Sequence, residues 1–285
     1  MKACRSGQRV IWSRKKGIPL SVEQRSPNPT IGVIGLGTIG GGIAANLHAA
    51  GFPLVVCDVR SQATDRHADY ATVAASPAEV ARASDVVVVS TISTACVAAI
   101  GAEATALGVP IVDCGVSGGP SAAASGNLVC MCGGDPEVIA GLAPLFDAVG
   151  SLTVTMGPFG TGLAAKLARN LVQYGGWLAA YEGQVLAEAA GIDLAKLAQV
   201  VRASDAQSGG AATLMFRPTV APFSDADDPG LVGAMQAAAA LAHKDVRAAL
   251  ALAEELDVEL PLAAMTEARC GEIFGVGMPP ESPGA

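Results

Sequence analysis

The chain has 285 residues, of which 51% are hydrophobic and 15% are charged, and it carries a formal net charge of −8. This composition predicts packed cores in two domains and excludes a largely disordered chain. The acidic balance excludes a nucleic-acid partner, which would need a basic surface. The most apolar stretches, 86–102 and 231–242, are interrupted by polar residues. They fall short of the roughly 20 apolar residues of a membrane span, so no membrane partner is expected.

The first 29 residues differ from the rest of the chain in their charge. Residues 1–28 hold seven Lys or Arg and one acid, a charge of +6, which leaves −14 on the remainder. We expect residues 1–29 to form a basic, disordered extension. A targeting or polyanion-binding segment is the alternative that this charge leaves open, although the segment lacks the apolar stretch of a secretory signal.

Cysteine and histidine usage indicates the compartment and the metal content. The seven cysteines are odd in number and include no CxxC pair. This pattern is typical of a reducing cytoplasm rather than of a secreted protein held by disulfides. The three histidines show no spacing of a metal site, so we expect a cytoplasmic protein without a bound metal.

A βαβ unit is predicted at the start of the folded body. Residues 30–34 predict a short buried strand, residues 40–50 a helix, and residues 54–57 a second strand that leads to Asp58. Further strands are predicted at 86–89, 109–113 and 128–132, with helices between them. This alternation predicts an α/β fold, a Rossmann-type doubly wound parallel sheet over residues 30–159.

From residue 160 onward the pattern becomes helical. Ala, Leu and Val recur at helical spacing over 163–190, 194–202 and 231–256, without a convincing strand pattern between them. Residues 160–285 are therefore predicted to form an all-α C-terminal domain. A helical domain this apolar would best be buried against a second copy of the chain, so we expect a homodimer or a higher homo-oligomer.

The strongest motif is the glycine-rich turn that follows the first predicted strand and opens the first helix, Gly35-Leu36-Gly37-Thr38-Ile39-Gly40. The first glycine permits a tight turn, the second lets the backbone approach a pyrophosphate, and the third lets helix and strand pack closely. Phosphates would then meet the free N–H groups of the helix N-terminus. This context predicts a dinucleotide site rather than a simple glycine-rich turn.

The expected dinucleotide is NAD. Asp58 follows the second strand, 21 residues after Gly37, where a carboxylate can accept the ribose hydroxyls and repels the extra phosphate of NADP. Arg60 lies two residues further on and could accept that phosphate. NADP therefore stays open as the second choice.

Four motifs in order resemble those of the β-hydroxyacid dehydrogenases, the family of 3-hydroxyisobutyrate dehydrogenase and tartronate semialdehyde reductase. GLGTIG resembles the family's GLGxMG, with Ile39 in place of Met. Residues 113–119, DCGVSGG, resemble the substrate-loop motif DxPVSGG, with Gly115 in place of Pro. Two further motifs, GxGxxxKxxxN and a KD pair, are matched by Gly160, Gly162, Lys166 and Asn170, and by Lys244-Asp245. The matches span residues 30 to about 270.

Lys166 and Asn170 are four residues apart and therefore lie on one face of a helix. A carbonyl held there could receive a hydride on carbon and a proton on oxygen. The resemblance makes Lys166 the acid in reduction and the base in oxidation, and makes Asn170 a substrate-orienting residue. For this role the pKa of Lys166 must fall from ~10.4 through burial or a nearby cation. A solvated surface lysine is the alternative.

The resemblance also implies which residues bind substrate and cofactor. Ser117, Gly118 and Gly119 follow a predicted strand and would hold the substrate carboxylate, the alternative being a mobile surface turn. Thr91 would contact the nicotinamide end of the cofactor. Lys244 would reach the same site, the alternative being a salt bridge with its neighbour on a helix surface.

The chain departs from the family pattern in one place. The strand at 86–89 is followed at once by Ser90-Thr91-Ile92-Ser93, whereas in the family a helix and a further strand precede this segment. One crossover unit is therefore missing. We expect a narrower sheet and an incomplete wall beside the nicotinamide.

These observations predict an oxidoreductase that transfers a hydride between NAD(H) and a small carboxylate substrate, a β-hydroxyacid similar to 3-hydroxyisobutyrate. An imine reductase of the same superfamily is an alternative, and Lys166 argues against it because those enzymes usually lack a lysine there. The missing crossover leaves open a catalytically impaired dinucleotide-binding protein. A purely structural oligomer is the remaining alternative.

Overall fold

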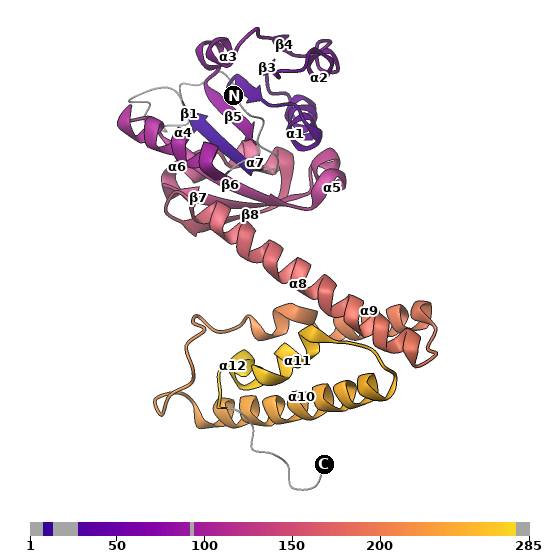
Figure 1. Ribbon diagram of the computed structural model, residues 1–285. Helices are drawn as coiled ribbons and strands as arrows, with labels where there is room; N and C mark the ends of the chain where they lie inside the picture. The colour runs from indigo at the N-terminus through magenta and orange to yellow at the C-terminus, as the bar shows by residue number, and fades with distance from the viewer. Residues whose placement is uncertain (1–7, 14–27, 92–93, 278–285) are drawn as a thin grey trace. The chain divides into compact units, whose positions relative to one another are not determined.

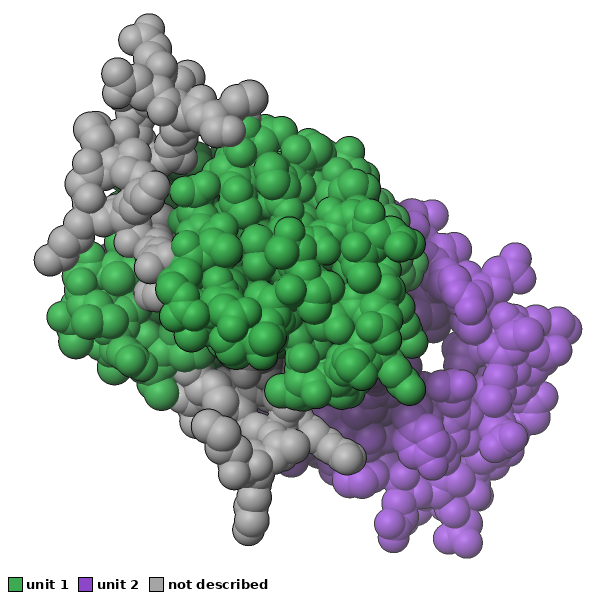
Figure 2. Space-filling view, turned by 90° about the horizontal axis from the view of Figure 1, so that it is seen from above, with its two compact units in different colours: residues 1–169 green, residues 170–285 purple. Residues whose placement is uncertain are grey.

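The computed structural model describes residues 8–13, 28–91 and 94–277. The chain divides into two compact units, Met1–Arg169 and Asn170–Ala285, which Figure 2 distinguishes by colour. The division falls ten residues after the expected start of the helical domain. The reason is that the first turns of the helix shared by the two units pack against the sheet of the first unit.

The first unit is built on one sheet, which Figure 1 shows among its surrounding helices. In the described part of the chain this sheet has eight strands in the order β4-β3-β2-β5-β1-β6-β7-β8. The strands are β1 (Gln8–Ser13), β2 (Ile31–Ile34), β3 (Leu54–Cys57), β4 (Thr72–Val73), β5 (Val86–Thr91), β6 (Ile111–Ser117), β7 (Leu128–Gly134) and β8 (Gly150–Gly157).

The α/β class and the helical C-terminal part are confirmed, but the sheet is not parallel throughout. β2, β3, β4 and β5 pair in parallel, as the βαβ pattern predicts. β7 is antiparallel to β6, and β8 is parallel to β7. The direction changes because only ten residues join β6 to β7, whereas a parallel crossover needs a dozen or more.

β1 occupies a place in the sheet that the sequence patterns do not predict. These six residues were expected to belong to a disordered extension, yet they run antiparallel between β5 and β6 and pair with both. The centre of the strand, Val10-Ile11-Trp12, is a run of three residues with high strand propensity, which suits a strand that has neighbours on both sides. The expectation that the sheet is one strand narrower is therefore wrong.

Local signals explain the helices of the first unit. Ser76 caps α3 (Pro77–Ala83), since its hydroxyl oxygen accepts the Glu79 N–H at 3.3 Å and Pro77 occupies the first turn. The other helices are α1 (Thr38–Ala49), α2 (Ser61–Asp65), α4 (Thr94–Ala106), α5 (Gly119–Ser125), α6 (Pro136–Gly141) and α7 (Ala143–Val149).

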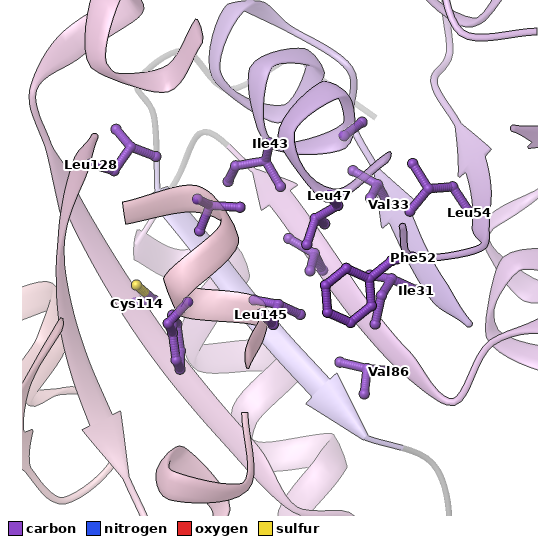
Figure 3. Packing of buried hydrophobic residues seen from close by; sticks show 14 of the residues in the cluster. Ile31, Val33, Ile43, Leu47, Phe52, Leu54, Val86, Cys114, Leu128 and Leu145 are labelled. Carbon is purple, nitrogen blue, oxygen red and sulfur yellow. The ribbon is translucent and has the colours of Figure 1, made fainter. Parts of the chain in front are cut away.

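The central parallel strands β2, β3 and β5 are buried on both faces. On one face Val33 and Val56, together with Leu47 of α1, are fully inaccessible to solvent and belong to the main hydrophobic cluster. Figure 3 shows part of this cluster. Alternate residues of the same strands, among them Val55 and Val87, form a second cluster, because successive side chains of a strand point to opposite faces. Each fully buried side chain of this size contributes about 1.5–3 kcal/mol, so the core keeps the carboxyl ends of the parallel strands in place.

The second unit is entirely helical in its described residues. It contains the C-terminal part of α8 (Thr161–Ala189), followed by α9 (Leu194–Ser208), η1 (Gly210–Leu214), α10 (Pro229–Glu255), α11 (Pro261–Ala268) and α12 (Cys270–Phe274). Glu182 of α8 is buried and accepts the N–H groups of Leu262 and Ala263 at 2.7 and 2.9 Å, which ties α8 to the start of α11. None of the described helices is long and apolar enough to cross a membrane.

Candidate active site

The glycine-rich turn between β2 and α1 requires glycine at two positions. Gly35 has a φ of +89°, and a Cβ there would lie 2.5 Å from the carbonyl oxygen of Ser90 in β5. A Cβ at Gly40 would overlap the carbonyl oxygen of Gly35. The turn is therefore packed directly against the carboxyl end of β5, and larger residues at either glycine would displace it.

Gly37, by contrast, borders open space. The residue is exposed, and a Cβ there would meet only the Arg60 guanidinium, at 4.0 Å. No side chain caps the N-terminus of α1, so the first N–H groups of that helix are available to a ligand. A dinucleotide pyrophosphate fits this turn, because its charge would be met by backbone donors and by the positive end of the helix dipole.

Asp58 supports the turn from the end of β3. Its Oδ2 accepts the Leu36 N–H at 2.7 Å, while its Oδ1 accepts the Arg60 N–H at 2.9 Å and pairs with Arg60 Nε at 3.1 Å. Burial alone would raise the pKa of the Asp58 carboxyl, but these hydrogen bonds outweigh burial and the pKa lies below its ordinary value. The carboxylate therefore stabilises the fold above the ordinary Asp pKa, and this stabilisation is lost as the pH falls through the lowered pKa.

Asp113 is fully buried in β6 and anchors the start of α8. Its Oδ1 accepts the Gly160 N–H at 2.6 Å and its Oδ2 accepts the Leu163 N–H at 2.7 Å. Burial raises the pKa of Asp113, and the backbone hydrogen bonds oppose that rise. Two N–H groups at the beginning of α8 that would otherwise lack a partner are thereby satisfied. One side chain joins the sheet to the helix that carries Lys166.

Two glycines let α8 lie directly on the sheet. A Cβ at Gly115 would lie 2.5 Å from the Gly162 carbonyl oxygen and 2.6 Å from the Cβ of Lys166. A Cβ at Gly162 would overlap the Met131 carbonyl oxygen of β7. Glycine at 115, where the resembling motif has Pro, thus permits this close approach. Lys166 is half-buried and lies against β6 at Gly115, which comes two residues before Ser117.

The Ser117-Gly118-Gly119 turn continues from this contact. Both glycines have left-handed backbones, with φ of +118° and +66°, and the turn opens α5. A Cβ at Gly119 would meet no atom within 4 Å, so the turn borders open space. The first unit therefore brings Lys166 and the predicted substrate turn together at the carboxyl end of β6, the edge at which ligands bind in open α/β sheets.

The other predicted site residues are placed as follows. Thr91 is the last residue of β5 and follows Ser90, which contacts the glycine-rich turn. Asn170 lies one turn after Lys166 in α8, at the start of the second unit. Lys244 is an exposed residue of α10, and its Nζ lies 3.2 Å from Oδ1 of Asp245. Asn170 and Lys244 belong to the second unit, so the geometry of the first unit does not test whether they are site residues.

The sequence patterns assign no role to Asp113, and they do not predict that Asp58 accepts the Leu36 N–H group. The available signal for Asp113 was a carboxylate inside an apolar strand pattern, since such a group is rarely buried without donors. Among residues 8–13, 28–91 and 94–277, no cluster of three or more His, Cys, Asp or Glu side chains could hold a metal ion.

Known protein families match most of the chain. Residues 30–90 and 86–157 match the NAD-binding domain of 6-phosphogluconate dehydrogenase, so residues 86–90 are matched twice. Residues 160–273 match the NAD-binding domain of NADP-dependent 3-hydroxyisobutyrate dehydrogenase. The two family models therefore match consecutive parts of the chain.

Individual relatives agree with these matches. An uncharacterized oxidoreductase of Mycobacterium tuberculosis is 37% identical, with 90% of this chain and 96% of the relative covered. The human mitochondrial 3-hydroxyisobutyrate dehydrogenase is 31% identical over 65% of this chain and 63% of its own. A crystal structure of an oxidoreductase from Mycobacterium avium 104 has a TM-score of 0.76 at 32% identity, with 87% of this chain and 99% of that chain covered.

A more distant likeness concerns the fold alone. An imine reductase variant from Myxococcus stipitatus, solved with NAD⁺, has a TM-score of 0.68 at 18% identity, with 85% of this chain and 92% of that chain covered.

Fold, glycine-rich turn and relatives together define a nicotinamide-dinucleotide-dependent oxidoreductase. The chain belongs to the β-hydroxyacid dehydrogenase family, whose members include the 3-hydroxyisobutyrate dehydrogenases.

The anchoring role of Asp113 can be measured as stability. We expect Asp113→Asn to lower the free energy of unfolding by about 1–3 kcal/mol in urea denaturation, because the amide group leaves one of two buried N–H groups without an acceptor. Asp193→Asn is the matched control, since Asp193 accepts the Ala195 and Lys196 N–H groups at the exposed start of α9 and should cost about 1 kcal/mol or less. Equal losses would contradict an anchoring role for Asp113 beyond ordinary helix capping.

Proposed function

We propose that this protein is an NAD-dependent dehydrogenase that interconverts a small β-hydroxyacid and its semialdehyde. The observation that carries the proposal is the contact between α8 and β6: Lys166 lies against Gly115, which precedes Ser117 by two residues in β6. A nicotinamide dinucleotide bound on the glycine-rich turn would supply the hydride acceptor. The relatives named for 3-hydroxyisobutyrate support this substrate class.

In the proposed reaction, the N–H groups of Ser117, Gly118 and Gly119 and the Ser117 hydroxyl hold the substrate carboxylate. Lys166 takes the proton of the substrate hydroxyl as the carbon loses its hydride, and it returns that proton to the carbonyl oxygen in the reverse direction. Asn170, one turn along α8, orients the same oxygen. Thr91 contacts the nicotinamide end of the cofactor, and the family resemblance assigns Lys244 to the cofactor as well.

Lys166 is tested by its removal. Lys166→Ala should lower kcat by about 100- to 10,000-fold, the usual contribution of a positioned acid and base, while NADH binding measured by fluorescence titration stays within about twofold. Lys196→Ala, at an exposed position of α9, is the control and should leave both quantities unchanged. Undiminished turnover of Lys166→Ala would rule out the proposed role.

Cofactor choice depends on the balance between Asp58 and Arg60. The Asp58 side chain is 6% exposed and engaged by both Arg60 and the turn, whereas the Arg60 side chain is 64% exposed and its guanidinium lies above Gly37. The negative charge of Asp58 opposes a 2′-phosphate, and exposed Arg60 could bind one. We propose that NAD is preferred and that NADP is accepted more weakly.

This preference is measured as the ratio of kcat/KM for NAD⁺ to that for NADP⁺. Asp58→Asn should lower the ratio by about 10-fold, equivalent to ~1.4 kcal/mol, because it removes the repelling charge and keeps an acceptor for the Leu36 N–H. Arg60→Ala should raise the ratio by weakening NADP⁺ alone. A ratio that neither substitution changes would mean that these residues do not select the cofactor.

We propose in addition that the second unit forms a homodimer. Large apolar side chains of α8 and α9 are exposed in the single chain, with exposed fractions of 74% for Leu171, 61% for Trp177 and 65% for Val200. α9, η1 and α11 contain no buried residue. A second copy would cover these surfaces, since patches of this kind are rarely left in water.

The mass in solution tests the dimer. Light scattering after size exclusion should give twice the 28.3 kDa of one chain, and Trp177→Asp should shift the population toward the monomer because a charge would be buried in the apolar interface. Gln236→Asp, at an exposed polar position of α10, is the control that should leave the mass unchanged. A monomeric wild-type protein would contradict the proposal.

The imine reductase alternative is decided by substrate. A screen of cyclic imines against short β-hydroxyacids, followed by nicotinamide absorbance, should show turnover of the hydroxyacids.

A further inference from the structure

β1 lies between the two strands that carry the two halves of the proposed site. It opposes Val86–Thr91 of β5 over six residue pairs and Ile111–Cys114 of β6 over four. β5 contacts the glycine-rich turn through Ser90. β6 holds α8 through Asp113 and the close contact at Gly115. In the sheet, β1 therefore lies between the strand that contacts the glycine-rich turn and the strand that holds the helix carrying Lys166.

The relatives indicate that another segment is absent from this place. Residues 86–90 are matched twice by the 6-phosphogluconate dehydrogenase NAD-binding domain, once as the end of 30–90 and once as the start of 86–157. One strand of this chain is thus matched in both parts of the alignment, at the point where the family pattern has a further helix and strand. The alignment with the M. tuberculosis oxidoreductase runs over 287 positions but covers 90% of 285 residues, about 257, which leaves about 30 positions opposite gaps in this chain. A strand with its crossover helix has about this length.

Without that segment, the backbone N–H and C=O groups along the facing edges of β5 and β6 need other hydrogen-bond partners. Val88 of β5 and Val112 of β6 are almost completely buried, and unpaired backbone groups at such positions would be costly. β5 and β6 run in the same direction and could pair with each other. That arrangement would bring them ~4.8 Å closer, by the spacing of one strand, and would move Asp113, Gly115 and α8 toward the glycine-rich turn by the same amount.

We infer that β1 replaces the missing strand, in the opposite direction, and that it sets the distance between the glycine-rich turn and Lys166. Residues 8–13 are by this inference an integral part of the cofactor domain. Because β1 is antiparallel, its first residues, Gln8 and Arg9, lie opposite Thr91 and Ser90, at the ligand-binding edge of the sheet. The second half of this inference depends on the proposed function, whereas the first half does not.

The register of β1 is tested directly by a cross-link in the full chain. Val10 lies opposite Val89, and opposed residues of antiparallel strands have the Cα separation that a disulfide requires. The double variant Val10→Cys/Val89→Cys should therefore form a disulfide under mild oxidation, identified by mass spectrometry of the joined peptides. Val22→Cys/Val89→Cys is the matched control, because Val22 belongs to the same basic stretch and lies outside β1.

The effect on the site is tested by Val10→Pro, which removes a backbone donor from the strand, with Val22→Pro as its control. Val10→Pro should lower Tm by about 4 °C or more and speed amide exchange in residues 86–91 and 111–117. In soluble, folded Val10→Pro protein, kcat should fall about 10-fold or more, while the KM for NADH changes less than threefold. A loss of stability alone would leave kcat unchanged in the folded fraction.

The outcomes separate the two parts of the inference. No cross-link between positions 10 and 89, or equal cross-linking from position 22, would overturn the strand replacement. A register-specific cross-link with an unchanged kcat in Val10→Pro would overturn the positioning role. If Lys166→Ala retains turnover while the cross-link forms in register, the proposed function fails and the strand replacement stands.

Discussion

The buried carboxylate of Asp113 is the interaction on which the proposed site depends. Its two oxygens bind two N–H groups at the start of α8, and no water reaches the residue to replace those partners. Because the carboxylate belongs to the middle of β6, the helix is fixed to the strand that ends at Ser117. The glycines at 115 and 162 then allow contact at backbone distance. In this way Lys166, on the long helix α8, is held at a fixed position relative to the carboxyl end of β6.

Two anchored segments therefore meet at one edge of the first unit. The glycine-rich turn is fixed by Asp58 and by its packing against Ser90, and the start of α8 is fixed by Asp113. Each anchor is a carboxylate that satisfies backbone donors rather than one that contacts a substrate. The groups assigned to chemistry, Lys166 and the Ser117 turn, are left partly exposed. Rigid supports and accessible reacting groups are what a preorganised site requires.

Much of this arrangement could be predicted from local sequence. The strand-turn-helix context of GLGTIG predicted the α/β fold, and helical spacing after residue 160 predicted the helical part, because both signals act over short stretches of chain. β1 was missed since its apolar run, Val10-Ile11-Trp12, has only three residues within a basic stretch, and its stability comes from partners far along the chain. Asp113 belongs to the DCGVSGG motif, but its role cannot be predicted from the motif, because its donors, at 160 and 163, are defined only by tertiary packing. Contacts between residues far apart in the chain are the part of the fold that local patterns in a single sequence do not predict.

The pairing of β1 also has a consequence for the order in which the domain is assembled. Gln8 pairs with a residue 83 positions later, Thr91, and Arg9 with one 105 positions later, Cys114. During synthesis β1 leaves the ribosome well before both of its partner strands, and its pairing with β6 must wait until more than a hundred further residues have followed it. The loop closures involved are long and entropically costly, so the sheet is completed late, and the nascent chain carries an unpaired strand while the rest of its sheet is being made.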